Sequence, residues 1–309
     1  MISLHDLLSS CIDVSRRAGA EIVRIHEQQG HDIEVKHKSG PKDPVTIADV
    51  NSEKLIKGLI SRQFPGLTII GEESTPVILP PSSEPMLRFD LTDMTLPSVP
   101  LNEVCLWVDP LDGTLEFVEG RLPYVSVLLG ISHRGTPVAG VLHQPFLNQT
   151  TFGAPGFGVQ GCTHSTAIEN PASDVCVIAH TFARGSPELD EMMKQFEPMR
   201  PERIGGSGTK GLALLEGKAH LFVHPHTSFT SRWDTCAIEA MLYATGGSLT
   251  DEWGIRYNYG PDTSRTNDRG LIAASAFGQR FLERYNAPAP PPTPAPGTPA
   301  PIPVHMAHH

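Results

Sequence analysis

Two aspartates three residues apart, at the end of an apolar run, are the strongest chemical signal in the sequence. The run 104–108 predicts a buried strand, and it ends in a turn that carries Asp109 and Asp112. Two ionised carboxylates about 4 Å apart repel by roughly 4 kcal/mol at the effective dielectric of a protein surface. A fold that keeps such a pair together is therefore expected to neutralise it with a cation.

Acidic residues also stand at the ends of other predicted elements. Asp49 lies in the first turn of a helix predicted over 48–64, Glu72 follows a strand predicted over 67–70, and Asp234 opens a later helix. Each has a simpler explanation when taken alone, and Asp234 in particular is typical of a helix N-cap. Together they form a set of hard oxygen ligands without a His or Cys partner, which suits Mg²⁺ or Mn²⁺ better than zinc.

The composition narrows the class of partner. The 309 residues are 39% hydrophobic, enough for a sizeable core, and the net charge of -10 disfavours binding to a nucleic-acid polymer or an anionic membrane. A small phosphorylated substrate would need locally placed cations. The five cysteines are odd in number and form no Cys-x-x-Cys pair, and no run of 18 apolar residues occurs. We therefore expect reduced thiols and a cytoplasmic protein.

Apolar periodicity predicts a mixed α/β fold with two units and a tail. A long helix opens the chain at 4–29, a surface excursion follows at 75–102, and an antiparallel meander covers 124–160. The second half alternates strands with helices; the strands are expected at 175–179, 219–223 and 271–274, and the helices at 187–196, 211–216, 235–245 and 276–285. We predict units at 1–165 and 166–286 and an extended proline-rich tail at 287–309.

Three motifs in order resemble those of a known superfamily. Gly71-Glu72-Glu73, the run from Trp107 to Thr114, and Trp233-Asp234 are similar to the motifs of the lithium-sensitive, magnesium-dependent phosphomonoesterases. That superfamily contains inositol monophosphatases, inositol polyphosphate 1-phosphatases, fructose-1,6-bisphosphatases and 3'(2'),5'-bisphosphate nucleotidases. The run 109–120 looks most like the nucleotidases, and so do 205–210 and 231–237. One departure is that 182–186 stands where nucleotidases often have a Ser-His pair.

The resemblance implies a layered α/β/α/β/α sandwich that holds at least two Mg²⁺ ions, with Mn²⁺ as a possible substitute. Glu72, Asp109 and the Leu111 carbonyl would bind one ion. Asp109, Asp112 and Asp234 would bind the second, so that Asp109 bridges the two. Bound cations would offset the carboxylate repulsion and activate the attacking water.

The resemblance also implies an activating pair, Asp49 and Thr114. The Thr114 hydroxyl would contact the water while Asp49 orients that hydroxyl. If a helix begins at Thr114, the N–H groups of Gly113 and Thr114 would face the phosphate. The alternative for Thr114 is an ordinary N-cap.

A glycine-rich segment, 206–211, leaves two interpretations open. It matches G-x-G-x-x-G and precedes a helix, as a dinucleotide-binding fingerprint would, but the preceding strand would contain Pro201 and the helix would break at Gly217. We favour a turn at Gly206 that brings backbone close to substrate, with Lys210 and Arg232 supplying positive charge; the alternative is a solvated basic pair. A second match at 156–161 predicts a hairpin loop.

Hydrolysis of 3'-phosphoadenosine 5'-phosphate to AMP and phosphate is the function that these residues and the resemblance favour. One alternative is an inositol polyphosphate 1-phosphatase or an enzyme with both activities. Another is a catalytically silent protein that binds nucleotide or metal. The oligomeric state is left open.

Overall fold

A computed structural model gives the fold of the chain. It describes all residues except 30–34, 38–43, 79–85, 88, 90, 92–94, 164–167, 169–172, 183–184, 229 and 290–309. The predicted proline-rich tail therefore lies almost entirely outside the described residues. Among the described residues, no helix combines the length and the apolar character that a membrane crossing needs.

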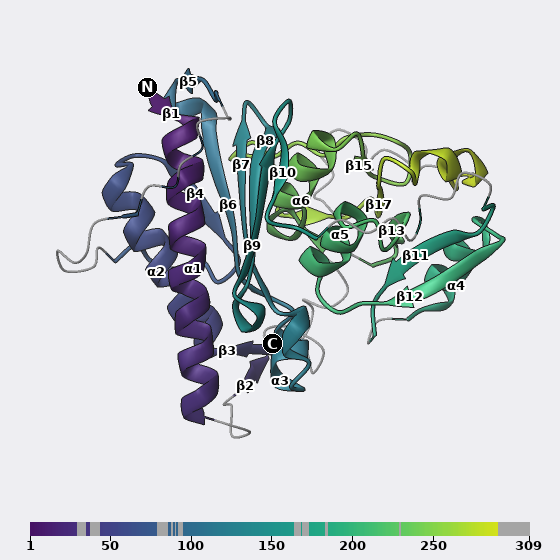
Figure 1. Ribbon diagram of the computed structural model, residues 1–309, viewed down its shortest axis with the longest axis horizontal. Coiled ribbons are helices and arrows are strands. Elements are labelled where there is room, and N and C mark those ends of the chain that lie inside the picture. Colours follow the sequence, from purple (N-terminus) through teal and green to yellow (C-terminus); the bar gives the residue numbers. More distant parts are fainter. Residues whose placement is uncertain are drawn as a thin grey trace, which may run out of the picture.

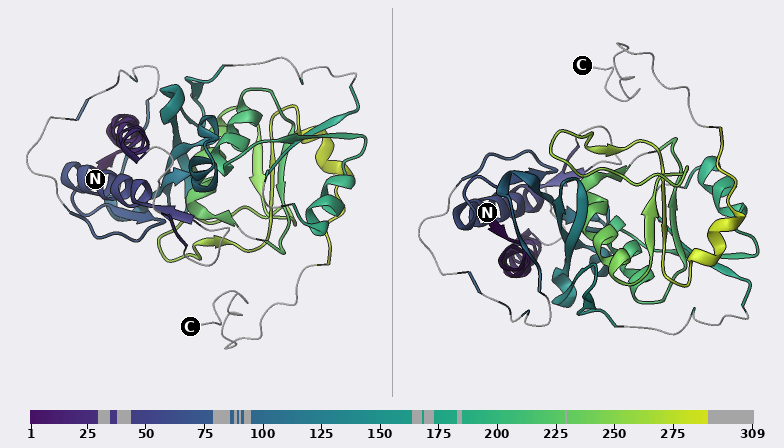
Figure 2. Two further views of the ribbon diagram at one scale, coloured as in Figure 1. Left: turned by 90° about the horizontal axis from the view of Figure 1, so that it is seen from below. Right: turned by 90° about the horizontal axis from the view of Figure 1, so that it is seen from above.

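The chain folds as a layered α/β/α/β/α sandwich, as the sequence predicted (Figure 1). Two long helices, α1 (Leu4–Gln29) and α2 (Ile47–Gln63), cover the outer face of a six-stranded sheet. Helices α5 (Ser207–Leu215) and α6 (Arg232–Ala244) fill the space between that sheet and a five-stranded one. Helix α4 (Pro187–Lys194) packs on the far face of the second sheet. Figure 2 shows the same succession of layers from two further directions.

The first sheet has the strand order β10-β9-β8-β7-β6-β4. The strands from β6 to β10 are the predicted antiparallel meander and its neighbour: β6 (Val104–Asp112), β7 (Ser126–His133), β8 (Thr136–Gln144), β9 (Gln149–Ala154) and β10 (Gly158–Gln160). The glycine-rich segment 156–161 forms the β9–β10 hairpin, as predicted. Strand β4 (Thr68–Gly71) runs parallel to β6 at the edge of the sheet.

Strand β6 is apolar at every position before its acids because both of its faces are buried. Leu106 and Val108 belong to the core under α1 and α2, while Cys105 and Trp107 face α6. This alternation within a continuous apolar run is typical of a strand at the centre of a layered fold. The acidic end of β6, which carries Asp109 and Asp112, therefore lies between the α1–α2 layer and the α5–α6 layer.

The register of β4 and β6 explains why acids from two motifs lie at one place. The two strands are parallel, with Gly71 paired to Val108, so Glu72 and Asp109 leave the sheet side by side. The Glu72 N–H donates to the Val108 carbonyl over 3.2 Å. The pairing of β6 with β7 is interrupted between Asp109 and Asp112, which frees that turn from the regular pleat.

The second sheet has the order β12-β11-β13-β17-β15. This half of the chain differs from the prediction in two places. Strand β12 (Met199–Arg203) was not predicted because it contains Pro201, but it lies at the sheet edge, where proline removes no internal ladder bond. The helix predicted at 276–285 is wrong: that segment forms a 3₁₀ turn over Gln279–Arg284. The other strands are β11 (Cys176–His180), β13 (Leu221–His224), β15 (Ser248–Thr250) and β17 (Leu271–Ala274).

Short elements complete the described chain. Three two-stranded ladders pair β1 (Ile2–Ser3) with β5 (Ser98–Val99), β2 (Val35–His37) with β3 (Pro44–Thr46), and β14 (Thr230–Ser231) with β16 (Thr266–Asn267). Helix α3 (Thr114–Val118) follows β6, and three further 3₁₀ turns span Leu101–Glu103, Leu122–Tyr124 and Pro145–Leu147. Helices α5 and α6 begin earlier than predicted, at Ser207 and Arg232.

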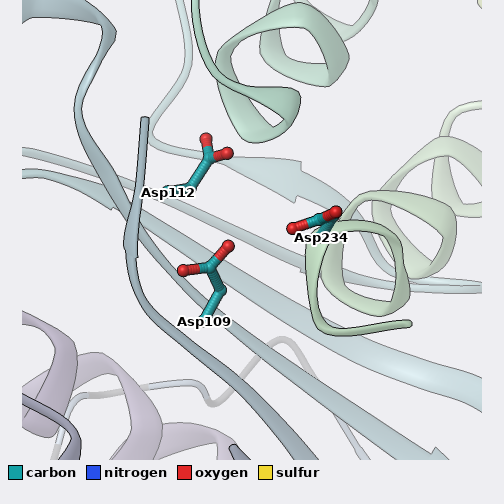
Figure 3. Close-up of side chains that lie close together, drawn as sticks. All are labelled: Asp109, Asp112 and Asp234. Carbon is teal, nitrogen blue, oxygen red and sulfur yellow. The ribbon is translucent and has the colours of Figure 1, made fainter. Parts of the chain in front are cut away.

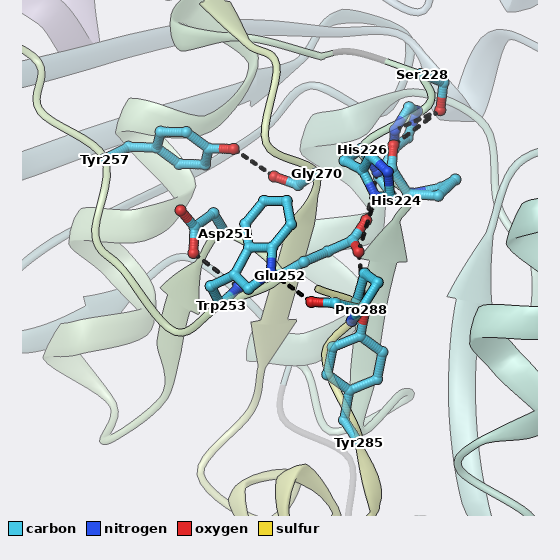
Figure 4. Close-up of polar contacts among 11 residues, drawn as sticks. His224, His226, Ser228, Asp251, Glu252, Trp253, Tyr257, Gly270, Tyr285 and Pro288 are labelled. Atoms are coloured by element: carbon cyan, nitrogen blue, oxygen red, sulfur yellow. Dashed lines mark hydrogen bonds and ion pairs between the residues drawn. The ribbon is translucent and has the colours of Figure 1, made fainter. Parts of the chain in front are cut away.

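A buried glutamate, Glu252, holds the end of the folded chain in place (Figure 4). Its carboxylate accepts a hydrogen bond from the Tyr285 hydroxyl over 2.9 Å and lies 3.1 Å from His226 Nδ1. Beside it, the Trp253 indole donates to the Pro288 carbonyl over 2.8 Å. These contacts join the last described residues to the loop that leads into α6.

Candidate active site

Three aspartates from two elements converge on one point between the layers. Asp109 and Asp112 come from the end of β6, Asp234 comes from the first turn of α6, and one oxygen of each lies within 4.8 Å of the others. Figure 3 shows the three carboxylates turned toward one another. Asp109 and Asp112 are buried and Asp234 is partly buried. The strand and the helix thus bring together two motifs that are more than 100 residues apart.

Asp112 is held at the beginning of α5. The N–H groups of Ser207 and Gly208 donate to its two oxygens over 2.8 and 2.9 Å, and the Ser126 hydroxyl donates over 2.9 Å. A Cβ atom on Gly206 would lie 2.6 Å from Asp112 Oδ2, which explains why this turn needs glycine. In a dinucleotide-binding fold, the N–H groups at the beginning of this helix would bind a phosphate. Here they bind the Asp112 carboxylate, which contradicts the dinucleotide alternative.

Asp234 and Asp49 occupy equivalent positions in two different helices. Each is the third residue after a hydroxyl-bearing N-cap, and each accepts the N–H of that cap: Ser231 to Asp234 over 2.7 Å, and Thr46 to Asp49 over 2.8 Å. The alternative that Asp234 is itself the N-cap is wrong. This position fixes one carboxylate oxygen, so the orientation of the side chain is set before any ligand arrives.

Thr114 joins Asp49 to the β6 turn. Its hydroxyl lies 3.0 Å from Asp49 Oδ1 and 3.1 Å from the Leu111 carbonyl oxygen. The N-cap alternative for Thr114 is wrong, because the helix begins at Thr114 and its cap is Gly113. Gly113 has φ +85°, and a Cβ there would lie 2.8 Å from the Tyr124 carbonyl oxygen, so both conformation and space select glycine.

Burial and mutual repulsion dominate the electrostatics of the cluster. Burial, together with the charges of Glu72, Asp112 and Asp234, raises the pKa of Asp109 well above its ordinary value. Burial and the charge of Asp234 raise the pKa of Asp112 to about 6, although Lys210 opposes that shift. Burial also raises the pKa of Asp49. Carboxylates in this state favour either protons or a cation.

The donor set fits a hard divalent cation. The converging atoms are all carboxylate oxygens, and two of the three aspartates are buried, so a divalent ion would replace the repulsion with attraction. The carbonyl of Leu111 also lies beside Thr114. The site residues thus suit the metal that the sequence predicted.

Glu53 and Lys57, on α2, were missed at the level of sequence. Glu53 is fully buried; it accepts the N–H groups of Glu73 and Thr75 over 2.7 and 2.8 Å and pairs with Lys57 over 2.8 Å. A Cβ on Gly71 would lie 2.3 Å from the Glu53 carboxylate. Glu53 therefore shapes the turn that carries Glu72. Its only local signal is the i, i+4 spacing from Lys57, which is common on exposed helices.

Lys210 and Arg232 are not a solvated basic pair, because only 5% and 6% of them are exposed. The Lys210 ammonium donates to the Gly206 carbonyl over 2.5 Å and lowers the pKa of Asp112, so its charge acts on the cluster. The Arg232 guanidinium donates to Asn267 and stacks on Tyr257 at 4.1 Å. This position favours a structural role for Arg232 over the predicted contact with substrate.

The layered fold and the acidic cluster together define a protein with a candidate metal site between its two main sheets. The model of the inositol monophosphatase family matches residues 4–288, so the chain belongs to that family. The 3'(2'),5'-bisphosphate nucleotidase 1 of Rattus norvegicus is 33% identical over 295 residues, which cover 89% of this chain and 93% of the relative. The putative inositol monophosphatase 3 of Drosophila melanogaster is 27% identical, with coverage of 92% and 81%.

Solved structures agree on the fold. The extragenic suppressor protein suhB of Bartonella henselae superposes with a TM-score of 0.66 at 22% identity, covering 90% of this chain and 98% of that one. Family membership and the named relatives together identify the chain as a phosphatase.

Proposed function

We propose that this phosphatase uses Mg²⁺ to hydrolyse 3'-phosphoadenosine 5'-phosphate to AMP and phosphate. The observation that carries the chemistry is the hydrogen bond between Asp49 and Thr114 directly beside the aspartate cluster. In the proposal, residues 1–165 supply most of the metal ligands and 166–286 supply Asp234 and the substrate contacts. We place the reaction in the cytoplasm, because the five cysteines are free thiols.

The acids divide into two ligand sets. Glu72, Asp109 and the Leu111 carbonyl would hold one Mg²⁺, and Asp109, Asp112 and Asp234 would hold the other, with Mn²⁺ able to replace either. When bound, the ions offset the carboxylate charge and lower the pKa of the attacking water. Ser207 and Gly208 keep Asp112 oriented, and Ser231 keeps Asp234 oriented, because each donates a backbone N–H to the carboxylate.

Asp49 and Thr114 would move the proton of the attacking water. Asp49 accepts the Thr114 hydroxyl hydrogen, which leaves the hydroxyl oxygen free to accept a hydrogen from water. As the water oxygen attacks phosphorus, its proton passes to Thr114 and the Thr114 proton passes to Asp49. The bond between phosphorus and the 3'-oxygen of the nucleotide breaks at the same time, and that oxygen takes a proton from solvent, so that AMP and phosphate leave the site. The N–H groups of Gly113 and Thr114 would face the phosphate, and Gly206 and Lys210 would border the second phosphate.

An aromatic pair next to the site supports a nucleotide over an inositol. Phe182 is 36% exposed, and its ring lies 5.4 Å from that of Tyr124 in an edge arrangement. The Tyr124 carbonyl in turn lies against Gly113 and Gly206, beside Asp112. A flat base can stack on an exposed aromatic ring, whereas an inositol ring has no π face to offer.

Parallel assays of phosphate release would test the substrate. We expect faster hydrolysis of 3'-phosphoadenosine 5'-phosphate than of inositol 1,4-bisphosphate, and inhibition by millimolar Li⁺, as the family resemblance implies. Preference for the inositol would instead support the 1-phosphatase alternative. Tight nucleotide binding without phosphate release at millimolar Mg²⁺ would support a silent binding protein.

Phe182→Ala would test the aromatic pair. Loss of one stacking partner costs about 1–3 kcal/mol, so KM for the nucleotide should rise about 5- to 150-fold while kinetics with inositol 1,4-bisphosphate stay unchanged. Phe157→Ala is the matched control, since Phe157 is also 36% exposed but lies in the β9–β10 hairpin. Equal effects on both substrates would contradict the assignment of Phe182 to base binding.

A further inference from the structure

The segment 257–267 touches both of the elements that carry the aspartate cluster. At one end the Tyr259 N–H donates to the Gly135 carbonyl over 2.9 Å, in the turn between β7 and β8. At the other end β16 pairs with β14, which leads directly into α6. The segment therefore spans from the first sheet to the beginning of the helix that carries Asp234.

The backbone of Tyr259 is attached to β6 and β7. Its carbonyl accepts the indole N–H of Trp107 over 3.0 Å and the hydroxyl of Ser132 over 2.8 Å. Trp107 is fully buried and stands two residues before Asp109 on the same strand. A shift of Tyr259 would therefore break a hydrogen bond of the strand that positions Asp109.

The side chain of Tyr259 is attached to α6. Its hydroxyl lies 3.1 Å from Thr235 Oγ1 and 2.5 Å from Glu239 Oε2, and the residue is fully buried. Thr235 directly follows Asp234, and Glu239 lies one turn further along the helix. One residue thus contacts the strand of Asp109 through its carbonyl and the helix of Asp234 through its hydroxyl.

We infer that Tyr259 is a positioning residue that sets the separation of Asp109 and Asp234 and thereby the affinity for the divalent cation. The inference rests on the metal-binding part of the proposed function. The carboxylates repel when no cation is bound, and that repulsion acts to move α6 away from β6. A tether between the two elements keeps the ligands close, and residues that orient metal ligands typically change metal affinity 10- to 100-fold when removed.

Tyr243 offers a matched control on the same carboxylate. Its hydroxyl donates to Glu239 Oε1 over 2.8 Å, and its other contact, at 3.2 Å, is the Leu249 carbonyl in β15. Tyr243→Phe and Tyr259→Phe therefore remove the same chemical group from the same glutamate. They differ in that Tyr259 also contacts Thr235 and lies on the path to β6.

Calorimetric titration with Mn²⁺ alone, without substrate, tests the inference directly. We expect Tyr259→Phe to weaken Mn²⁺ binding about 10-fold and Tyr243→Phe to change it less than twofold. The Mg²⁺ concentration for half-maximal turnover should rise by the same factor in Tyr259→Phe, and saturating Mg²⁺ should restore kcat. Trp107→Phe, which removes the indole donor from the Tyr259 carbonyl, should weaken Mn²⁺ binding in the same direction.

Unchanged Mn²⁺ affinity in Tyr259→Phe, or equal weakening in Tyr243→Phe, would overturn the inference, as would native protein that binds no Mn²⁺. If Mn²⁺ binding follows the expected pattern but 3'-phosphoadenosine 5'-phosphate is not hydrolysed, only the proposed substrate fails. The metal titration and the substrate assay therefore separate the two hypotheses.

Discussion

Two groups of buried carboxylates in this molecule differ in what surrounds them. Glu53, Glu239 and Glu252 are as deeply buried as Asp109 and Asp112. Glu53 pairs with Lys57 and accepts two backbone N–H groups. Glu239 accepts hydrogen bonds from two tyrosine hydroxyls. Glu252 accepts them from the Tyr285 hydroxyl and the His226 backbone N–H (Figure 4). These glutamates connect elements, and each carboxyl group has hydrogen-bond donors within the fold.

The aspartate cluster differs in that its carboxylates also face one another. The charged groups that raise the pKa of Asp109 are Glu72, Asp112 and Asp234, all of them acids. Backbone N–H groups orient Asp112 and Asp234 but leave the carboxylates facing one another. A buried carboxylate whose hydrogen-bond donors lie on neighbouring elements stabilises the fold. Buried carboxylates that face one another repel, and a bound cation would relieve that repulsion.

Asp234→Asn is expected to have the largest effect. Loss of one ligand charge should lower turnover about 10³-fold or more, because the substitution removes electrostatic stabilisation where charge develops. The metal-free protein should become more heat-stable, by about 2 °C for each kcal/mol of repulsion relieved. Steady-state kinetics and calorimetric melting in EDTA would measure both. Retained turnover would contradict the two-metal proposal, and a lower melting temperature in EDTA would contradict the repulsion.

Glu53→Ala should lower the free energy of unfolding, whereas Asp234→Asn should raise the stability of the metal-free protein. The change leaves the buried Lys57 ammonium without its carboxylate, and breaking such a pair costs about 3–5 kcal/mol. Urea unfolding would measure the loss. Adding Lys57→Met should recover part of it, because the unpaired charge is then gone. Additive losses in the double variant would show that the two side chains do not act as a pair.

The comparison also shows how far the sequence alone could lead. The approach of Asp109, Asp112 and Asp234 could be anticipated because all three lie in short contiguous motifs, and two of them stand three residues apart at the end of a strongly apolar strand. The layered fold followed from the resemblance of those motifs to a known superfamily. The predictions of the acidic cluster and of the layered fold both rested on local sequence patterns, which can be recognised without knowing how the elements pack.

The supporting residues were not predictable because their partners are distant in sequence. Glu53 acts on the turn at 71–75, and Tyr259 joins Trp107 to Thr235, in a segment without helical or strand periodicity. Arg232 was predicted to contact substrate because it lies two positions before Asp234; its packing on Tyr257 is a contact that this spacing does not reveal. Such contacts form only when the layers pack together, and they produce no regular spacing of residues in the sequence.

Added Mg²⁺ should stabilise the native protein by mass action. At 100 times the dissociation constant, a ligand that binds only the folded state adds about 2.7 kcal/mol, so the melting temperature should rise about 5 °C above that in EDTA. The increase should disappear in Asp112→Asn, which lacks one ligand charge, and persist in Glu252→Gln, whose acid is satisfied within the fold. An equal increase in all three proteins would indicate binding elsewhere on the surface.

Glu239 provides the smallest and most selective test, because its effect depends on pH. Burial raises the pKa of Glu239 to about 7, although hydrogen bonds from Tyr259 and Tyr243 oppose the shift. The folded protein therefore binds a proton that the unfolded chain has already released between about pH 4.5 and 7, so this group's contribution to stability declines as pH rises through that range. Glu239→Gln carries no such proton. Relative to the native protein, the variant should gain about 2 kcal/mol of unfolding free energy between pH 5 and 8, measured by urea unfolding in EDTA. Parallel pH profiles for the two proteins would mean that Glu239 is ionised throughout and that its two tyrosine donors satisfy it completely.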